Sequence, residues 1–235
     1  MHVTLCRRRR ARVAATLSLL LPMAAAQAVE TSGSAALTSD YVWRGTSQSN
    51  EDPAVQAGFK FAGASGIYGQ IWGSSVEFAP DTRASSEFDL IAGWSGDLSD
   101  ALALDVNLTR YVYPSTTVDL DWTEANATVT WQERVWLQVG HSRDALASDT
   151  AGTYAQLGAR WPLTDTFRVE AAAGRYWLAR GSGYDDYAHA QLGAVWMFAA
   201  PLELRLTVHD TDASAVQAFP GLAGSRIEAA LQASF

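Results

Sequence analysis

Charged side chains are the residues of this sequence with the clearest capacity for chemistry, because many of them alternate with apolar residues along short segments. Eight acidic and six basic residues share the polar parity of these segments. The set consists of Asp40, Glu87, Asp89, Asp105, Glu124, Glu170, Glu203 and Glu228, with Arg44, Lys60, Arg160, Arg168, Arg205 and Arg226. Such residues can line a passage for polar solutes, or they can pair with one another and close it. Both interpretations stay open, with Arg44 expected at a constriction or in a salt bridge with a loop.

Other groups of residues suggest catalysis or metal binding, but none has the required spacing. The run His141–Asp144 contains a histidine, a serine and an aspartate. A catalytic triad needs its histidine within hydrogen-bond reach of both partners, whereas neighbouring residues of a strand point to opposite faces. The acidic pairs in 119–121 and 210–212 fall short of a calcium-loop pattern. The sequence therefore predicts neither an enzyme nor a cofactor or metal, with lipid hydrolysis as an alternative.

Strict alternation of apolar and polar residues identifies the elements that carry these charges. The clearest case is an apolar row that includes Ile227, Leu231 and Phe235. Alternation with period two is typical of a strand that has one face in an apolar medium and the other in a polar one. Twelve segments show it, at residues 34–44, 54–61, 67–78, 88–94, 102–108, 125–131, 135–139, 155–161, 167–173, 188–196, 202–208 and 227–235. The even number predicts an all-β, twelve-stranded antiparallel up-and-down transmembrane β-barrel.

Two further points follow from these segments. Within 67–78 the apolar residues change parity, which predicts a β-bulge that switches faces. Barrels of eight strands are filled by their side chains and those of about sixteen hold open channels, so twelve strands fall between these cases. A lumen of this size is expected to be narrow.

Connection lengths and aromatic residues indicate how the barrel lies in a membrane. Short joins follow the even-numbered segments and longer polar loops follow the odd ones. In bacterial barrels short turns face the periplasm and long loops the outside, so we expect periplasmic termini and extracellular loops. An aromatic residue of lipid-facing parity precedes each short turn and ends the last segment, which predicts an aromatic girdle at one membrane boundary. Its members are Phe61, Trp94, Trp131, Trp161, Trp196 and Phe235.

Four other aromatic residues have positions that suit the opposite girdle. They are Tyr41, Trp43, Trp122 and Trp177. The alternative is that all these rings belong to the core of a secreted β-sandwich or a lipocalin-like barrel. Such a core does not require one aromatic residue at the same end of every second strand.

The first 28 residues have the pattern of a secretory signal peptide. A cluster of five arginines precedes an apolar segment and the small-residue site Ala26–Ala28, so we expect residues 1–28 to be removed and 29–235 to form the barrel. The only cysteine, Cys6, would be lost with the leader. Without its five arginines the chain keeps 12 basic against 25 acidic residues, a net charge of −13. This charge argues against a nucleic-acid partner.

Residues 34–78 carry a recognisable set of short motifs, which are Ser39–Gly45, Ser47–Ser49, Pro53, Ala54, Gln56, Ser65–Tyr68 and Trp72. This set resembles the opening signature of the TorF-type porin family, a group of Gcw_chp-like bacterial outer-membrane proteins. Trp43 stands where the pattern has phenylalanine, and Ala57 where it has glycine. The resemblance implies an outer-membrane channel for small solutes, with trimethylamine N-oxide suggested for one member. It supplies no catalytic or binding residues.

Together these features favour an outer-membrane porin that lets small hydrophilic solutes diffuse through a narrow polar lumen, with a slight preference for cations. The alternatives are a closed structural or adhesive outer-membrane barrel, or a lipid hydrolase. Expected partners are outer-membrane lipid with lipopolysaccharide, the barrel-assembly machinery and the solutes themselves. The long loops are rich in acidic residues. They could concentrate cations, or simply be solvated or share divalent ions with lipopolysaccharide.

Overall fold

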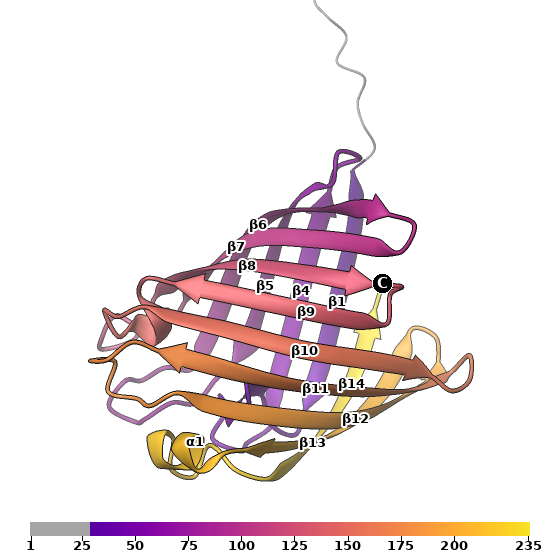
Figure 1. Ribbon diagram of the computed structural model, residues 1–235. Coiled ribbons are helices and arrows are strands. Elements are labelled where there is room, and N and C mark those ends of the chain that lie inside the picture. Colours follow the sequence, from indigo (N-terminus) through magenta and orange to yellow (C-terminus); the bar gives the residue numbers. More distant parts are fainter. Residues whose placement is uncertain (1–28) are drawn as a thin grey trace, which may run out of the picture.

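The computed structural model describes residues 29–235, which form a closed barrel of twelve antiparallel strands (Figure 1). The expected leader with Cys6 lies outside the described residues. The barrel strands are β1 (Glu30–Thr38), β4 (Ala54–Ala62), β5 (Ile67–Ser75), β6 (Ser86–Ser99), β7 (Leu102–Val112), β8 (Trp122–Trp131), β9 (Val135–Ser142), β10 (Gly152–Pro162), β11 (Phe167–Leu178), β12 (Tyr187–Ala199), β13 (Leu202–Thr211) and β14 (Arg226–Ser234).

Each barrel strand pairs with its neighbours in the chain, and β1 closes the ring by pairing with both β4 and β14. Leu37 of β1 lies opposite Leu231 of β14. Beyond the end of β14, Phe235 exchanges two backbone hydrogen bonds of 2.6 and 2.9 Å with Gly33. The Phe235 ring lies against Gly33, where an added Cβ would be only 2.6 Å from a ring carbon. The predicted up-and-down barrel is thus confirmed.

The outer surface of the barrel is apolar. Leucine, isoleucine and valine side chains such as Leu37, Val55 and Leu157 are more than half exposed on the outside of their strands. Exposed apolar rows of this extent on many strands would be unfavourable in water, and they are stable against lipid. The residues between them carry the polar and charged side chains inward. This is the surface of a transmembrane barrel.

The two ends of the barrel differ in the length of their connections. At one end, the turn end, strands are joined by residues 63–66, 100–101, 132–134, 163–166 and 200–201. At the other, the loop end, the joins are 39–53, 76–85, 113–121, 143–151, 179–186 and 212–225. The loops include a small hairpin of β2 (Val42–Trp43) and β3 (Thr46–Ser47), the 3-10 helix η1 (Ala145–Ala147) and α1 (Ala213–Ala218). Within residues 29–235 neither helix is long and apolar enough to cross a membrane.

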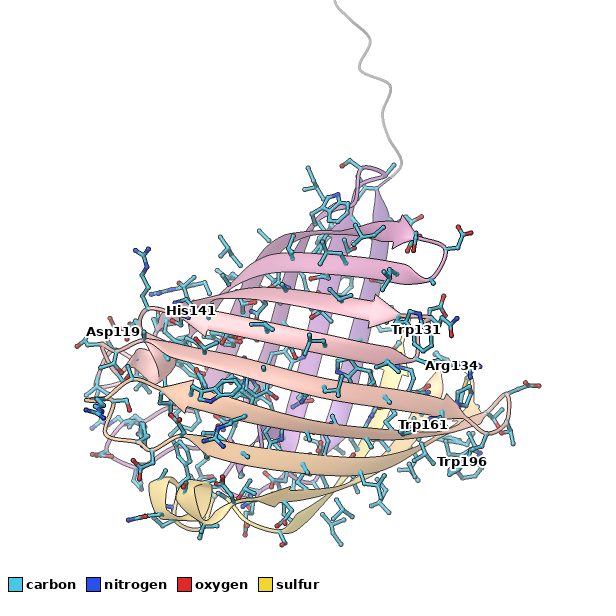
Figure 2. The ribbon with its side chains drawn as sticks, viewed as in Figure 1. Asp119, Trp131, Arg134, His141, Trp161 and Trp196 are labelled. Carbon is cyan, nitrogen blue, oxygen red and sulfur yellow. The ribbon has the colours of Figure 1, made fainter. Side chains whose placement is uncertain are left out.

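Aromatic residues surround the turn end on the outside. Trp131, Trp161 and Trp196 lie at this end in Figure 2, and each is about half exposed. Phe61 and Phe235 are similarly exposed. Trp94 is partly covered, and its Nε1 donates a hydrogen bond of 2.9 Å to the Ser65 carbonyl. That these rings mark a membrane boundary stays a prediction.

The expectation for the first strand was wrong at its second half. The strand ends at Thr38, and the chain then turns into the barrel instead of continuing to residue 44. Consequently Tyr41 is buried and Trp43 packs against the interior clusters, so neither belongs to an outer girdle. Trp122 is also buried inside, and only Trp177 of the proposed opposite girdle is exposed. Parity alone cannot distinguish a strand from a loop that continues its alternation.

The expected bulge in 67–78 is absent. The strand β5 pairs without interruption with β4 and β6, and Tyr68 and Trp72 lie on its inner side next to other aromatic and polar groups. Register shifts occur instead near the turn end, between Asp97 and Ser99 and between Met197 and Ala199. The interior accommodates large aromatic side chains as well as charges, so an aromatic residue of inward parity does not require a change of face.

Candidate functional site

A segment of the first long loop enters the barrel at the loop end and divides its interior. It contains the β2–β3 hairpin, and we call residues 42–47 the septum. Its turn places Arg44 at φ 49° and Gly45 at φ 85°, which is the left-handed region that favours glycine. A Cβ on Gly45 would lie 2.6 Å from the Cβ of His189. The close approach of the hairpin to β12 therefore depends on glycine at this position.

The Arg44 side chain attaches the septum to the opposite wall. Its guanidinium donates two hydrogen bonds to Glu124 of β8, from Nη1 at 2.9 Å and Nη2 at 2.7 Å. It also lies 4.2 Å from the ring centre of Trp43, 3.8 Å from that of Tyr154 and 4.9 Å from that of Tyr176. Planar bidentate pairing and aromatic stacking are the two contacts for which arginine is best suited. They hold the septum in one position.

The Arg44 charge is stabilised where it lies. Burial lowers the pKa of the guanidinium, and the adjacent Glu124 carboxylate outweighs this effect, so the pKa is raised overall. Side-chain exposure is 6% for Arg44 and 0% for Glu124. Because both charges have lost their water, each depends on the other for stabilisation.

A second set of contacts fixes the start of the inserted loop. Asp40 accepts hydrogen bonds from the hydroxyls of Ser47 at 2.6 Å and Ser49 at 3.1 Å, and it forms a 3.3 Å ion pair with Arg226 of β14. Neighbouring loops add backbone bonds, from Ser47 N to the Leu222 carbonyl at 2.8 Å and from the Glu77 amide to the Gln48 carbonyl. The inserted loop is thus held by the wall and by two other loops.

Beside the septum lies a pair of carboxyl groups without a cation among the described residues. Glu87 and Asp89 of β6 are on one face, and one oxygen of each is buried without a hydrogen-bond partner. Two tyrosines from the loops face them. Burial and these two carboxyl groups raise the pKa of Tyr41 and of Tyr113 well above the usual range. Both phenols therefore remain neutral.

At the turn end the lumen charges form a separate network on one side of the barrel. Arg168 of β11 donates to both oxygens of Glu203 on β13 at 2.7 and 2.8 Å, and to Glu170 at 2.8 Å. Arg205 donates to the other oxygen of Glu170 at 2.6 Å. These side chains are partly exposed, in contrast to those at the septum.

The other basic residues at the turn end, Lys60 and Arg160, lie over neutral aromatic rings. Lys60 Nζ lies 3.7 Å from the ring centre of Tyr68, whose hydroxyl donates to Asp105 at 2.9 Å. Arg160 lies 5.2 Å from the ring centre of Trp136. At the loop end, His209 Nε2 and Glu228 are 2.9 Å apart. All fourteen charged residues thus lie in the interior; that they line an open pore stays a prediction.

Two cavities lie on either side of the septum, and Trp43 is the one residue that lines both. The outer pocket, about 260 Å³, is mainly apolar, with Phe78, Tyr113, Trp122 and Tyr187 in its wall. The inner chamber, about 420 Å³, is polar and extends below Arg44 along the barrel wall. The septum therefore separates the outer pocket from the inner chamber.

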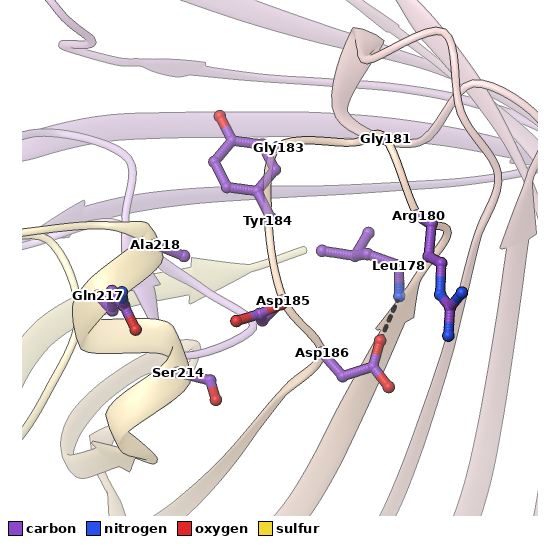
Figure 3. A pocket seen from close by; sticks show the side chains of 10 residues that line it. All are labelled: Leu178, Arg180, Gly181, Gly183, Tyr184, Asp185, Asp186, Ser214, Gln217 and Ala218. Atoms are coloured by element: carbon purple, nitrogen blue, oxygen red, sulfur yellow. Dashed lines mark hydrogen bonds between the residues drawn. The ribbon is translucent and has the colours of Figure 1, made fainter.

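A wider groove adjoins the outer pocket at the loop end (Figure 3). Tyr184, which it shares with the outer pocket, lies on the loop between β11 and β12, and Ser214 and Gln217 of α1 form the other side. The Leu178 amide donates a hydrogen bond of 2.9 Å to Asp186 on this loop. The groove forms an open polar approach to the outer pocket.

Comparison with known proteins places this chain in a family. The profile of a family described as "Bacterial protein of unknown function (Gcw_chp)" matches residues 23–235. The chain belongs to the Gcw_chp family. A comparison with curated proteins finds no match.

Solved structures share the barrel of this Gcw_chp protein at low sequence identity. The KdgM porin in complex with disordered oligogalacturonate aligns with a TM-score of 0.56 at 6% identity, over 88% of this chain and 99% of that one. The NanC porin gives 0.56 at 8% identity, over 88% and 99%. An outer membrane channel from Pseudomonas putida F1 gives 0.52 at 11% identity, over 87% and 95%. At these identities the similarity establishes the fold: this Gcw_chp chain has the fold of outer-membrane channels.

The histidine and serine considered for catalysis do not form a pair. His141 Nδ1 lies 2.9 Å from the Thr153 hydroxyl on the outer side of the wall, whereas the Ser142 hydroxyl donates to the Thr123 carbonyl at 2.7 Å. Their side chains project from opposite faces, as expected for neighbours on β9. No group of three or more metal-ligating side chains occurs within residues 29–235.

Sequence reasoning missed the aromatic residues that surround Arg44. Tyr154, Tyr176 and Tyr187 are almost completely buried inside the loop end. Each has inward parity at the loop end of its strand. Aromatic residues that recur with inward parity at one end of neighbouring strands were the available signal for an occupied lumen.

Proposed function

We propose that this chain is a passive porin of the bacterial outer membrane for small hydrophilic solutes. The observation that carries the proposal is a polar chamber of about 420 Å³ inside a barrel whose outer surface is apolar. A polar interior is typical of outer-membrane barrels that hold a water-filled channel. The KdgM neighbour, described with an oligogalacturonate, supports a polar solute class.

Arg44 is the constriction residue in this proposal, since the septum is the narrow step between the outer pocket and the inner chamber. Solutes pass beside the Trp43 ring or during displacements of the hairpin. The paired charges of the wall hold water along the route without binding ions tightly.

The orientation follows the usual arrangement of bacterial barrels, with the turn end and both termini in the periplasm and the long loops outside. Arg110 and Arg175 are exposed on the outer surface near the loop end, where they reach phosphates of lipopolysaccharide. Residues 1–28 direct secretion. The barrel-assembly machinery then inserts the chain through its last strand.

The finer relationship to TorF-type porins is part of the proposal. Its support is that the run Ser39–Gly45, which carries the resemblance, supplies Asp40, Trp43 and Arg44 of the inserted loop. We therefore expect other TorF-type porins to divide their lumen with the same septum.

Planar-bilayer recording of the purified, refolded protein tests the proposal. We expect discrete single-channel steps, and reversal potentials in a salt gradient that reveal a slight cation preference. Swelling of proteoliposomes in solute series then gives the size limit. A folded protein that inserts without any steps and leaves liposomes impermeable would contradict the proposal.

The second candidate is a closed structural barrel, which the buried Arg44–Glu124 pair favours. It predicts that the wild type does not conduct but that a variant without this pair does. An adhesive role would instead show binding that depends on the loops, without conductance.

A further inference from the structure

We propose that the inner chamber is a binding site for one small neutral solute rich in hydroxyl groups, of the size of a polyol or a monosaccharide. This inference rests on the proposed porin function and names the class of solute for it. It is carried by the side chains of the chamber wall, which include six carboxamides.

Six carboxamides face the chamber from six different strands. They are Gln70, Asn107, Asn126, Gln138, Gln156 and Gln191. Thr109, Tyr68 and Tyr154 line the same wall, with their hydroxyls already hydrogen-bonded to Asn107, Asp105 and His189. Each carboxamide offers both a donor and an acceptor, so it can bind either side of a hydroxyl group. A solute with several hydroxyls can satisfy many of these groups at once.

Several of these groups lack a partner within the described part of the chain. The amide groups of Gln70, Gln138 and Gln191 form no side-chain hydrogen bond with residues 29–235. The Oδ1 atom of Asn126 is buried without a partner. By contrast, Gln156 is held between Tyr154 at 2.9 Å and Trp136 at 3.2 Å. The chamber thus combines fixed amides with free ones.

Two charged side chains, Arg44 and Asp89, line the chamber. Arg44 is neutralised by the bidentate contact with Glu124. Asp89 faces the chamber as the one carboxyl group in its lining, and it can accept hydrogen bonds from hydroxyls. The other charged network lies toward the turn end and is internally paired. A binding site made mainly of uncharged donors and acceptors discriminates by hydrogen bonding.

The dimensions of the chamber agree with this class. Its volume of about 420 Å³ lies within the range of about 300–1,000 Å³ that is usual for small-molecule sites. The Trp136 indole donates a hydrogen bond to Gln156 of the chamber wall, and Trp43 lines the top of the chamber. Bound solute would therefore change the environment of two indoles.

A fluorescence titration of the refolded full chain tests the inference independently of conduction. We use glucose as probe, polyethylene glycol of similar mass as a neutral solute with few hydroxyl donors, and tetramethylammonium as a cation. Saturable fluorescence changes are expected with glucose only, and the Gln138→Leu/Gln191→Leu double variant should bind glucose about tenfold more weakly, since each loses hydrogen bonds. Gln232→Leu, on the wall outside the chamber, is the matched control and should bind like the wild type.

The outcomes separate the two claims. Binding of glucose without any channel current would support the site and contradict the porin function. Channel current with no saturable glucose signal, or with equal responses to glucose and polyethylene glycol, would overturn the site and leave the porin function intact. Saturation by tetramethylammonium instead of glucose would also overturn it, as would a double variant that is folded and binds as well as the wild type.

Discussion

The two ends of the lumen use the same pair of chemical groups in different surroundings. At the septum, the Arg44 and Glu124 side chains are 6% and 0% exposed, and three aromatic rings surround the guanidinium. At the turn end, Arg168 and Glu203 are 27% and 22% exposed and form a bidentate contact of similar length. The hydrogen-bond lengths of the two Arg–Glu pairs are thus nearly equal, while their exposure to water differs strongly.

This difference separates a structural clamp from a wetted wall. Removing one partner of a buried pair leaves an uncompensated charge, whereas a pair in contact with water can replace its partner by solvent. The reach of the two networks differs as well. Arg44 comes from the loop between β1 and β4 and contacts β8, β10 and β11 across the lumen. Within residues 29–235, the Arg168 side chain donates hydrogen bonds only to residues of β11 and β13. The septum therefore links opposite sides of the barrel, whereas the turn-end network links strands on one side.

The strongest way to break the comparison is Glu124→Gln. The variant leaves the Arg44 charge buried without its carboxylate, and we expect a loss of about 3–5 kcal/mol in the free energy of unfolding. The hairpin should also leave the lumen, so single-channel conductance should rise several-fold. Urea unfolding and planar-bilayer recording measure the two effects. Arg175→Gln, on the exposed outer surface, is the control and should change neither.

An unchanged conductance in Glu124→Gln, with the expected loss of stability, would show that the septum stays in place without its clamp. The difference between the two ends would then affect the stability of the barrel but not its conductance.

Gly45→Ala tests the backbone of the septum with a smaller expected effect. The position combines φ 85° with a Cβ that would lie 2.6 Å from His189, so we expect a loss of about 2–3 kcal/mol. Gly183 has the same φ of 85° but nothing within 4 Å of an added Cβ. Gly183→Ala should therefore cost only the backbone term, about 1 kcal/mol. Equal losses in the two variants would mean that the close approach to β12 contributes nothing.

Arg168→Gln sharpens the comparison from the turn end. Because water reaches this network, we expect a loss of stability of only about 1 kcal/mol. The variant leaves Glu203 and Glu170 with fewer cations, so the wall becomes more acidic and reversal potentials should shift toward cation preference. A loss as large as that of Glu124→Gln would contradict the assignment of this network to a wetted wall.

Trp131→Ala carries the comparison to the outer surface and should have the smallest effect. The ring lies outside at the turn end, where an interfacial indole is expected to contribute about 1 kcal/mol or less. Unfolding from lipid bilayers should reveal a slightly less stable barrel with unchanged conductance. Trp177→Ala at the loop end is the matching substitution, and a difference between the two would reveal which rim is anchored more firmly.

Much of the fold was predictable because each strand carries its own evidence. The row from Ile227 to Phe235 alternates with period two, and it forms the strand that the pattern predicts, next to β1. The short connections likewise predict β-hairpins from the local sequence alone. Local periodicity suffices wherever one face of an element meets lipid and the other meets water.

The septum could not be predicted in this way. Tyr41 and Trp43 continue the alternation of β1, although the chain has already turned inward. Arg44 and Glu124 are 80 residues apart, and nothing local to either position reveals their contact. Parity predicted an inward position for the fourteen charged residues, although Asp40 and Arg44 reach the interior on the inserted loop and not on a strand. The division of these charges into a dry and a wet group depends on which aromatic side chains surround them. That information lies in the packing of several strands.

The contacts of Arg44 also affect the shape of the barrel. A ring of hydrogen-bonded strands resists being stretched around its circumference, but it deforms easily into an oval, because ovalisation breaks few ladder bonds. Arg44, on the loop between β1 and β4, forms a cross-link (a spoke) to β8, β10 and β11, and this cross-link fixes the diameter at the loop end. The other rim, whose charges bridge only strands on one side, has no such spoke among the described residues. Lateral pressure from the bilayer should therefore flatten one rim of this cylinder more readily than the other.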